Sequence, residues 1–211
     1  MRSAIESILL CLLAGVYGCA CPQSLGERVD DIARQAALLH AYQRPDVQQV
    51  VFQTVIRWGE RGISLTEIVK AAPEGGFSVV GLSDIGKTLY AVRVDRDGKG
   101  QVVSKSLPFS NQWLLDGPVA ELLLPWNGPD ETCPLHRLPN GTWALVCQAK
   151  RDVRMFIFGE AGQWIEFRRF SGCRLLSRTS LEWDGGPVPK VMRVDNPGNQ
   201  YRVVRERVSS Q

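Results

Sequence analysis

The chain has 211 residues, of which 44% are hydrophobic and 22% charged, so it can bury a core of ordinary size as one domain. Its net charge of +3 is spread over scattered Lys and Arg residues, which excludes the clustered basic surface of a nucleic-acid-binding protein. The sequence has 2 histidines and no pair of Cys-x-x-Cys motifs, so we expect no metal site and no cofactor.

The first residues have the pattern of a secretory signal. Arg2 supplies a positive start, an apolar run follows over residues 8–18, and small residues adjoin Cys19. The apolar run is too short to span a bilayer, because a spanning helix needs about 20 apolar residues. We therefore predict that residues 1–18 are a signal peptide removed during export.

Cys19 is the candidate lipidation site. Bacterial lipoprotein signals end in Leu or Val, a small residue, Gly or Ala, and then Cys. Residues 16–19, Val-Tyr-Gly-Cys, match this motif except at the second position, where tyrosine replaces the small residue. Acyl chains such as palmitate on Cys19 would anchor the protein in a membrane, since each buried CH₂ adds about 0.8 kcal/mol. Ala20 stands where Asp would retain a lipoprotein at the inner membrane, which points to a periplasm-facing protein of the outer membrane. The alternatives are lipidation at Cys21 or ordinary cleavage that frees the chain there.

Residues 19–46 combine the attachment site with a predicted helix. From Pro22 to Tyr42 the apolar residues recur with helical spacing, Ser24 can cap the start, and Pro45 stops the helix. The alternative is a partly ordered tether between the lipid and the domain.

Residues 47–211 are dominated by predicted β-strands. Runs rich in β-branched and aromatic residues are separated by Gly, Pro, Asn and Asp turn signals at even spacing. The predicted strands cover residues 50–58, 64–71, 77–82, 87–95, 101–106, 135–138, 142–148, 153–158, 163–170, 174–183, 190–195 and 201–208. So many short strands are too many for a small sandwich and favour a long, curved antiparallel sheet. The predicted fold class is mainly β (α+β), a half-barrel sheet with a few packing helices.

One segment interrupts the strands. Residues 111–127 are apolar, with helical spacing in the middle; Pro118 suits a first helical turn and Pro125 ends it. We predict a short helix over residues 118–126 that packs on or over the sheet. Four large apolar side chains are candidates either for a lid or for plain core packing: Trp113, Leu123, Leu124 and Trp126.

The cysteines beyond the signal predict a disulfide, because an exported chain meets an oxidising compartment. Cys133 and Cys147 flank a predicted hairpin at residues 139–141 and are the first candidate pair; Cys147 with Cys173 is the rival. Spacing does not decide between them, since a disulfide requires a specific Cα separation.

The sequence resembles the bacterial LolA/LolB-like lipoprotein carriers, and within that fold group a family of outer-membrane lipoproteins. The resemblance is carried by the signal ending in Cys19, the stretch 77–90, the segment 118–126 and a closing hairpin at residues 191–208. It implies an antiparallel half-barrel that is closed by helices and has an apolar cavity for acyl chains.

The residues themselves also favour a concave apolar face. A sheet that curves without closing leaves such a face, which either holds a ligand or is filled as core. The candidate lining residues are Phe52, Ile56, Trp58, Tyr90, Val92, Trp143, Leu145, Met155, Ile157, Ile165 and Phe167.

The sequence contains no Gly-x-Ser-x-Gly, His-Glu-x-x-His or phosphate-binding glycine motif, so we do not expect an enzyme. The leading hypothesis is a lipoprotein anchored in the outer membrane that binds or transfers an acyl-chain or lipid ligand. The alternative is a structural or interaction lipoprotein of an envelope complex, with a protein partner and no ligand.

Overall fold

The computed structural model describes residues 25–42 and 45–211. The predicted signal peptide and both candidate lipidation residues, Cys19 and Cys21, lie outside these ranges. Across the same two ranges, no helix has the length and apolar character that a membrane span requires.

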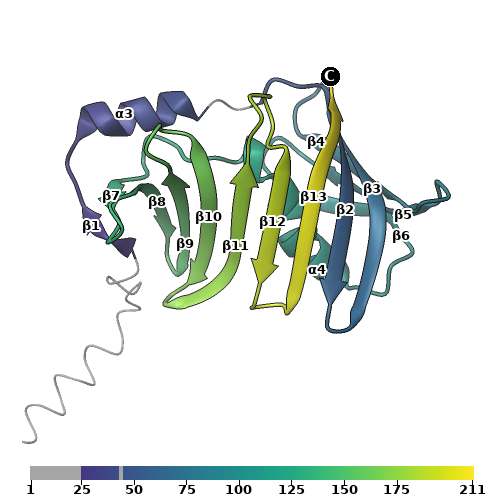
Figure 1. The fold of residues 1–211 in the computed structure, drawn as a ribbon. Helices are drawn as coiled ribbons and strands as arrows, with labels where there is room; N and C mark the ends of the chain where they lie inside the picture. Colours follow the sequence, from purple (N-terminus) through teal and green to yellow (C-terminus); the bar gives the residue numbers. More distant parts are fainter. Residues whose placement is uncertain (1–24, 43–44) are drawn as a thin grey trace, which may run out of the picture.

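The described chain forms an antiparallel sheet of 13 strands, in the order β1-β7-β8-β9-β10-β11-β12-β13-β2-β3-β4-β5-β6 (Figure 1). The first part of the chain contributes β1 (Glu27–Arg28), β2 (Gln49–Trp58), β3 (Arg61–Ala71), β4 (Phe77–Leu82), β5 (Thr88–Val94) and β6 (Gly100–Lys105). The second part contributes β7 (Leu135–Arg137), β8 (Trp143–Ala149), β9 (Asp152–Phe158), β10 (Trp164–Ser171), β11 (Arg174–Glu182), β12 (Val191–Asn196) and β13 (Tyr201–Ser210).

The last strand joins the two parts of the sheet. β13 pairs with β2, from Tyr201 opposite Trp58 to Ser210 opposite Val50. All other paired strands are consecutive in the sequence, except that the short β1 pairs with β7. The sheet curves but stays open, because β1 and β6 at its two ends each pair on one side only (Figure 1). The prediction of a curved antiparallel half-barrel is confirmed.

Every predicted strand is present, with small differences at the ends. β1 was not predicted, because a strand of two residues carries no recognisable alternation. It exists through its partner: Glu27 lies opposite Arg137, and Arg28 lies opposite His136, on β7.

The N-terminal helix is shorter than predicted. α3 spans Ile32–Ala41 and is capped by Asp31, whose Oδ1 accepts a hydrogen bond of 2.8 Å from the backbone N of Arg34. Before it, Gly26 has a φ of 76° and residues 27–28 pair with β7. The helix prediction is therefore wrong for residues 26–31, where pairing with a distant strand overrides the local helical spacing.

Residues 111–126 form a run of short helical turns rather than one regular helix. The run consists of α4 (Asn111–Leu114), the π-helical turn η1 (Leu115–Val119), α5 (Ala120–Leu122) and the 3₁₀ turn η2 (Leu124–Trp126). Pro118 lies inside the π turn, not in a first helical turn as predicted. Proline has no N–H to donate, and the wider turn locally replaces the regular ladder of hydrogen bonds. In the view of Figure 1 this helical segment lies behind β12, β13 and β2, on the concave face of the sheet.

Two hydrophobic clusters lie on opposite faces of the sheet. The concave-side cluster joins the helical segment, including Leu114 and Leu122, to strand residues such as Phe52 and Val203. The convex-side cluster consists of Leu25, Leu138, Ala144, Val146, Val153, Met155, Ile157 and Phe170. Successive side chains of a strand point to opposite faces, so β9 contributes to both clusters and is buried on both sides.

Candidate functional site

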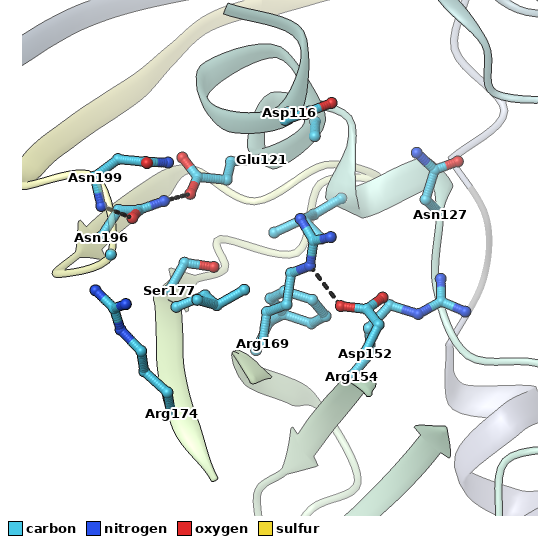
Figure 2. A pocket seen from close by; sticks show the side chains of 15 residues that line it. Asp116, Glu121, Asn127, Asp152, Arg154, Arg169, Arg174, Ser177, Asn196 and Asn199 are labelled. Atoms are coloured by element: carbon cyan, nitrogen blue, oxygen red, sulfur yellow. Dashed lines mark hydrogen bonds and ion pairs between the residues drawn. The ribbon is translucent and has the colours of Figure 1, made fainter. Parts of the chain in front are cut away.

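A pocket opens between the helical segment and strands β9 to β12 (Figure 2). Its volume is about 560 Å³, which falls within the range of about 300–1,000 Å³ that is typical of small-molecule sites. We call it the arginine pocket. Its lining residues are Asp116, Ala120, Glu121, Leu124, Asn127, Asp152, Arg154, Phe167, Arg169, Arg174, Leu176, Ser177, Asn196, Gly198 and Asn199.

Strand register places a pair of arginines next to a pair of phenylalanines at the arginine pocket. Arg154 of β9 lies directly opposite Arg169 of β10, and two residues further along the same strands Phe156 lies opposite Phe167. Residues two apart in a strand share a face, so both pairs project from the concave side. Phe156 and Phe167 also belong to the concave-side cluster. The pocket therefore leads from guanidinium groups to the apolar core.

Of the three arginines that line the pocket, Arg169 forms an ion pair within the described residues and the other two do not. Arg169 Nε donates to Asp152 Oδ1 at 2.8 Å. Neither Arg154 nor Arg174 makes an ion pair with any residue that the structure describes. In Figure 2, Arg154 and Arg174 lie on either side of Arg169. Two guanidinium groups of the pocket thus form no ion pair within the described chain, although hydrogen bonding and, to a smaller extent, the charge of Arg154 lower the pKa of Asp130.

Glu121 is the buried carboxyl group of the pocket, with 5% of the residue exposed. Asn196 Nδ2 donates to Glu121 Oε1 at 3.0 Å, and the Tyr201 hydroxyl donates to Oε2 at 2.8 Å. Burial raises the pKa of Glu121, although the hydrogen bond from Asn196 acts in the opposite direction. Burial and the adjacent Glu121 carboxyl raise the pKa of Tyr201, which keeps its hydroxyl a donor.

A second polar cluster is buried beneath the helical segment. Arg205 and Glu67 are fully buried, and Arg205 Nε donates to Glu67 Oε2 at 2.6 Å. The hydroxyl groups of Thr54 and Tyr90 also donate to the Glu67 carboxylate. Arg205 Nη2 donates to the carbonyl of Pro118 at 2.8 Å, so this cluster ties the π turn to the sheet.

Gly81 gives Tyr90 access to this cluster. The two residues lie opposite each other on β4 and β5, and a Cβ atom at Gly81 would overlap the Tyr90 ring. The absence of a side chain at position 81 therefore lets the ring lie across the strand and reach Glu67.

The predicted lining residues divide between the two faces. Phe52, Ile56, Tyr90, Val92, Leu145 and Phe167 are buried in the concave-side cluster, and Trp58 and Trp143 pack against it. Of these, Phe167 lines the arginine pocket; the others fill the core.

The prediction that Met155 and Ile157 line the concave face is wrong, because both are buried in the convex-side cluster. Ile165 packs against the same cluster. In register, Met155 lies opposite Val146, and Ile157 lies opposite Ala144, whereas Phe156 lies opposite Leu145. Because β9 is apolar on both faces, its sequence does not reveal which alternate residues face inward.

The predicted lid residues pack in the concave-side cluster or against it. Leu123, Leu124 and Trp126 are buried, and Trp126 lies against Phe77 with ring centroids 5.4 Å apart. Trp113 is partly buried and stacks on Phe109 at 4.0 Å between centroids. Of the four, Leu124 lines the arginine pocket.

Cys133 and Cys147 form the predicted disulfide, with their Cα atoms 4.4 Å apart. Cys173, the rival partner, is exposed and does not take part in this disulfide.

Among residues 25–42 and 45–211, no group of three or more His, Cys, Asp or Glu side chains is arranged to hold a metal ion.

The polar residues of the arginine pocket were not predicted. Arg154, Arg169 and Arg174 come from three neighbouring strands and have no shared motif. A usable signal existed in β9, where one face reads Asp152, Arg154, Phe156 and Phe158 and so passes from charged to aromatic residues.

Comparison with solved structures shows the same fold. A LolA superfamily protein from Nitrosomonas europaea matches with a TM-score of 0.52 at 9% sequence identity, covering 84% of this chain and 92% of that one. A DUF1329 family protein from Desulfovibrio piger matches with a TM-score of 0.53 at 13% identity, covering 85% of this chain and 91% of that one. No family model and no curated protein matches the sequence. The protein therefore has a LolA/LolB-like fold, as the sequence resemblance predicted.

Proposed function

We propose that this protein is a non-enzymatic, periplasm-facing lipoprotein of the bacterial outer membrane that binds or transfers a ligand with an acyl chain. The observation that carries the proposal is a pocket of about 560 Å³ that opens onto the apolar concave side of an open half-barrel. The lipoprotein-like signal ending at Cys19 and the LolA/LolB-like fold support it.

The ligand would enter between the helical segment and β9 to β12. Its acyl chain would contact Ala120 and Leu124 on the helical segment and Phe167 and Leu176 on the sheet. Each Å² of apolar surface removed from water contributes about 25 cal/mol to binding. The helical segment would act as a gate, because its displacement exposes the concave-side cluster to the chain.

Lipid analysis of the purified protein tests this proposal. The full chain is purified from membranes in a mild detergent, and co-purifying lipids are extracted and identified by mass spectrometry. Ala120→Trp should reduce the bound lipid by filling the pocket, whereas Ala71→Trp, at an exposed position at the end of β3, should not. Wild-type protein that carries no lipid above the detergent background and takes up no fluorescent fatty acid would contradict the proposal.

The anchor is tested separately from the pocket. Cys19→Ser should move the protein from the membrane fraction to the periplasm, because the acyl chains would no longer be attached. Unchanged membrane attachment would rule out lipidation at Cys19, and Cys21→Ser would then examine the neighbouring cysteine.

A second candidate function is a structural lipoprotein of an envelope complex. It is favoured by the complete burial of Phe52, Ile56 and Tyr90, which fill much of the concave side with the protein's own side chains. Crosslinking in intact membranes that yields one defined protein partner, with no lipid in the purified protein, would favour this candidate over the carrier.

A further inference from the structure

We propose that the arginine pocket is the headgroup subsite for an amphiphile with a single anionic oxyacid head, a carboxylate or a phosphate, held by Arg154 and Arg169. The assignment rests on the proposed lipid-binding function and adds the chemistry of the polar end of the ligand. It implies that a neutral lipid with the same acyl chain binds more weakly.

Strand pairing brings two of the positive charges together. Arg154 and Arg169 are directly opposite residues of adjacent antiparallel strands, whose Cα atoms are about 4.5–5.5 Å apart. Like charges at directly opposite positions destabilise a sheet. Asp152 pairs with Arg169 and leaves Arg154 without an ion pair, so an additional anion beside Arg154 would relieve the repulsion.

The pocket lining holds three carboxyl residues and three arginines, but among them one ion pair forms, between Asp152 and Arg169. Asp152 is used by Arg169, and Glu121 is directed to the neutral donors Asn196 and Tyr201. Asp116 is exposed on the helical segment and forms no ion pair in the described chain. Arg154, beside Arg169, is therefore available to a ligand, whereas Arg174 lies on the opposite side of Arg169 in Figure 2.

The donor chemistry selects an oxyacid. A guanidinium group presents a planar fork of N–H donors that matches the two oxygens of a carboxylate or phosphate. The side chain of Asn127, on the same side of the pocket as Arg154 in Figure 2, can also donate to such a group without adding charge.

The apolar part of the lining indicates an amphiphile rather than a free anion. Leu124, Phe167 and Leu176 line the same pocket as the arginines. Phe167 continues into the concave-side cluster, so an acyl chain attached to the anionic head would have apolar surface beside it. A small inorganic anion would use the arginines and leave this surface unused.

Paired fluorescent probes test the assignment. Binding of cis-parinaric acid and of its methyl ester to the full chain is measured in neutral detergent micelles, with probe partition into empty micelles subtracted. The two probes share an acyl chain and differ in the charge of the head. The acid should bind more tightly than the ester, and Arg154→Gln should weaken acid binding about tenfold and leave ester binding unchanged.

Arg57→Gln is the matched control. Like Arg154, Arg57 is a strand arginine that forms no ion pair with a described residue, but it is exposed on β2 and does not line the arginine pocket. This variant should keep the preference for the acid. Ester binding serves as the test of folding for every variant, because it depends on the apolar surface alone.

The outcomes separate this proposal from the proposed function. Equal binding of acid and ester by the wild type would overturn the headgroup assignment and leave the carrier function intact. A preference for the acid that survives Arg154→Gln would overturn the role of this residue. If neither probe binds, both proposals fail, and calorimetric titration with inorganic phosphate then shows whether the pocket takes a free anion.

Discussion

Replacement of Glu67 by glutamine tests the importance of the buried polar cluster. Glu67 accepts hydrogen bonds from Arg205, Thr54 and Tyr90, and it is the ion-pair partner of Arg205. Glutamine has nearly the same shape, so the substitution removes the negative charge with little change in packing. It leaves the Arg205 guanidinium buried without its ion-pair partner.

The expected loss of stability follows from the burial of both partners. The side chains of Glu67 and Arg205 are 0% exposed, so neither group can be compensated by solvent. Removing one partner of a buried ion pair typically costs about 3–5 kcal/mol. For a chain of this size, a loss of 1 kcal/mol lowers the melting temperature by about 2–4 °C, so we expect Glu67→Gln to melt about 6–20 °C below the wild type.

Thermal and urea denaturation followed by circular dichroism would measure both quantities. Glu182→Gln is the matched control, because Glu182 also forms an ion pair with an arginine of the sheet, Arg193, but the two side chains are 57% and 49% exposed. An exposed pair contributes about 0–1 kcal/mol, so this control should melt near the wild type.

An equally small loss of stability in both variants would contradict the expected effect of burial. Such a result would mean that Arg205 finds another counter-charge or water when Glu67 is neutral. A large loss in Glu67→Gln together with a small loss in Glu182→Gln is the expected result.

Three further predictions concern other parts of the fold. Reduction of the Cys133–Cys147 disulfide, whose sequence separation is 14, should lower the free energy of unfolding by about 3 kcal/mol in urea denaturation; a Cys133→Ser/Cys147→Ser variant should be insensitive to reductant. Burial raises the pKa of Glu121 in the folded state, so the wild type should lose stability relative to Glu121→Gln as the pH rises above the ordinary value of 4.5. Melting temperatures across this range measure the difference, and a difference independent of pH would contradict the prediction. Met155→Ala should cost about 2–5 kcal/mol by leaving a cavity in the convex-side cluster. The same substitution should not change binding of a fluorescent fatty acid; a loss of binding at unchanged fold would place Met155 on the ligand side.

The strands were predictable because their signals are local. Alternation of apolar residues and turn sequences such as Asn140-Gly141 marked where each strand begins and ends. The start of α3 was not predictable in the same way. Ser24 and Asp31 are both suitable caps, and the pairing of residues 27–28 with β7, far along the chain, decided where the helix begins.

The candidate site was less predictable than the fold. Its aromatic wall contains Phe167, which the sequence indicated, but the arginines that give the pocket its charge come from three strands. Arg154 and Arg169 meet through strand register, which no local pattern records. The two-sided burial of β9 also concealed that Phe156, rather than Met155, faces the concave side.

By itself, the sequence determined the succession of strands, the fold class and the segment that interrupts the sheet, because alternation and turn chemistry act over a few residues. The tertiary structure alone decided which residues of β9 face inward, which arginines share a pocket, and that Arg205 pairs with Glu67 across 138 residues of sequence. These features depend on strand order and register, and a shift of register by one residue would turn every side chain of a strand to the other face.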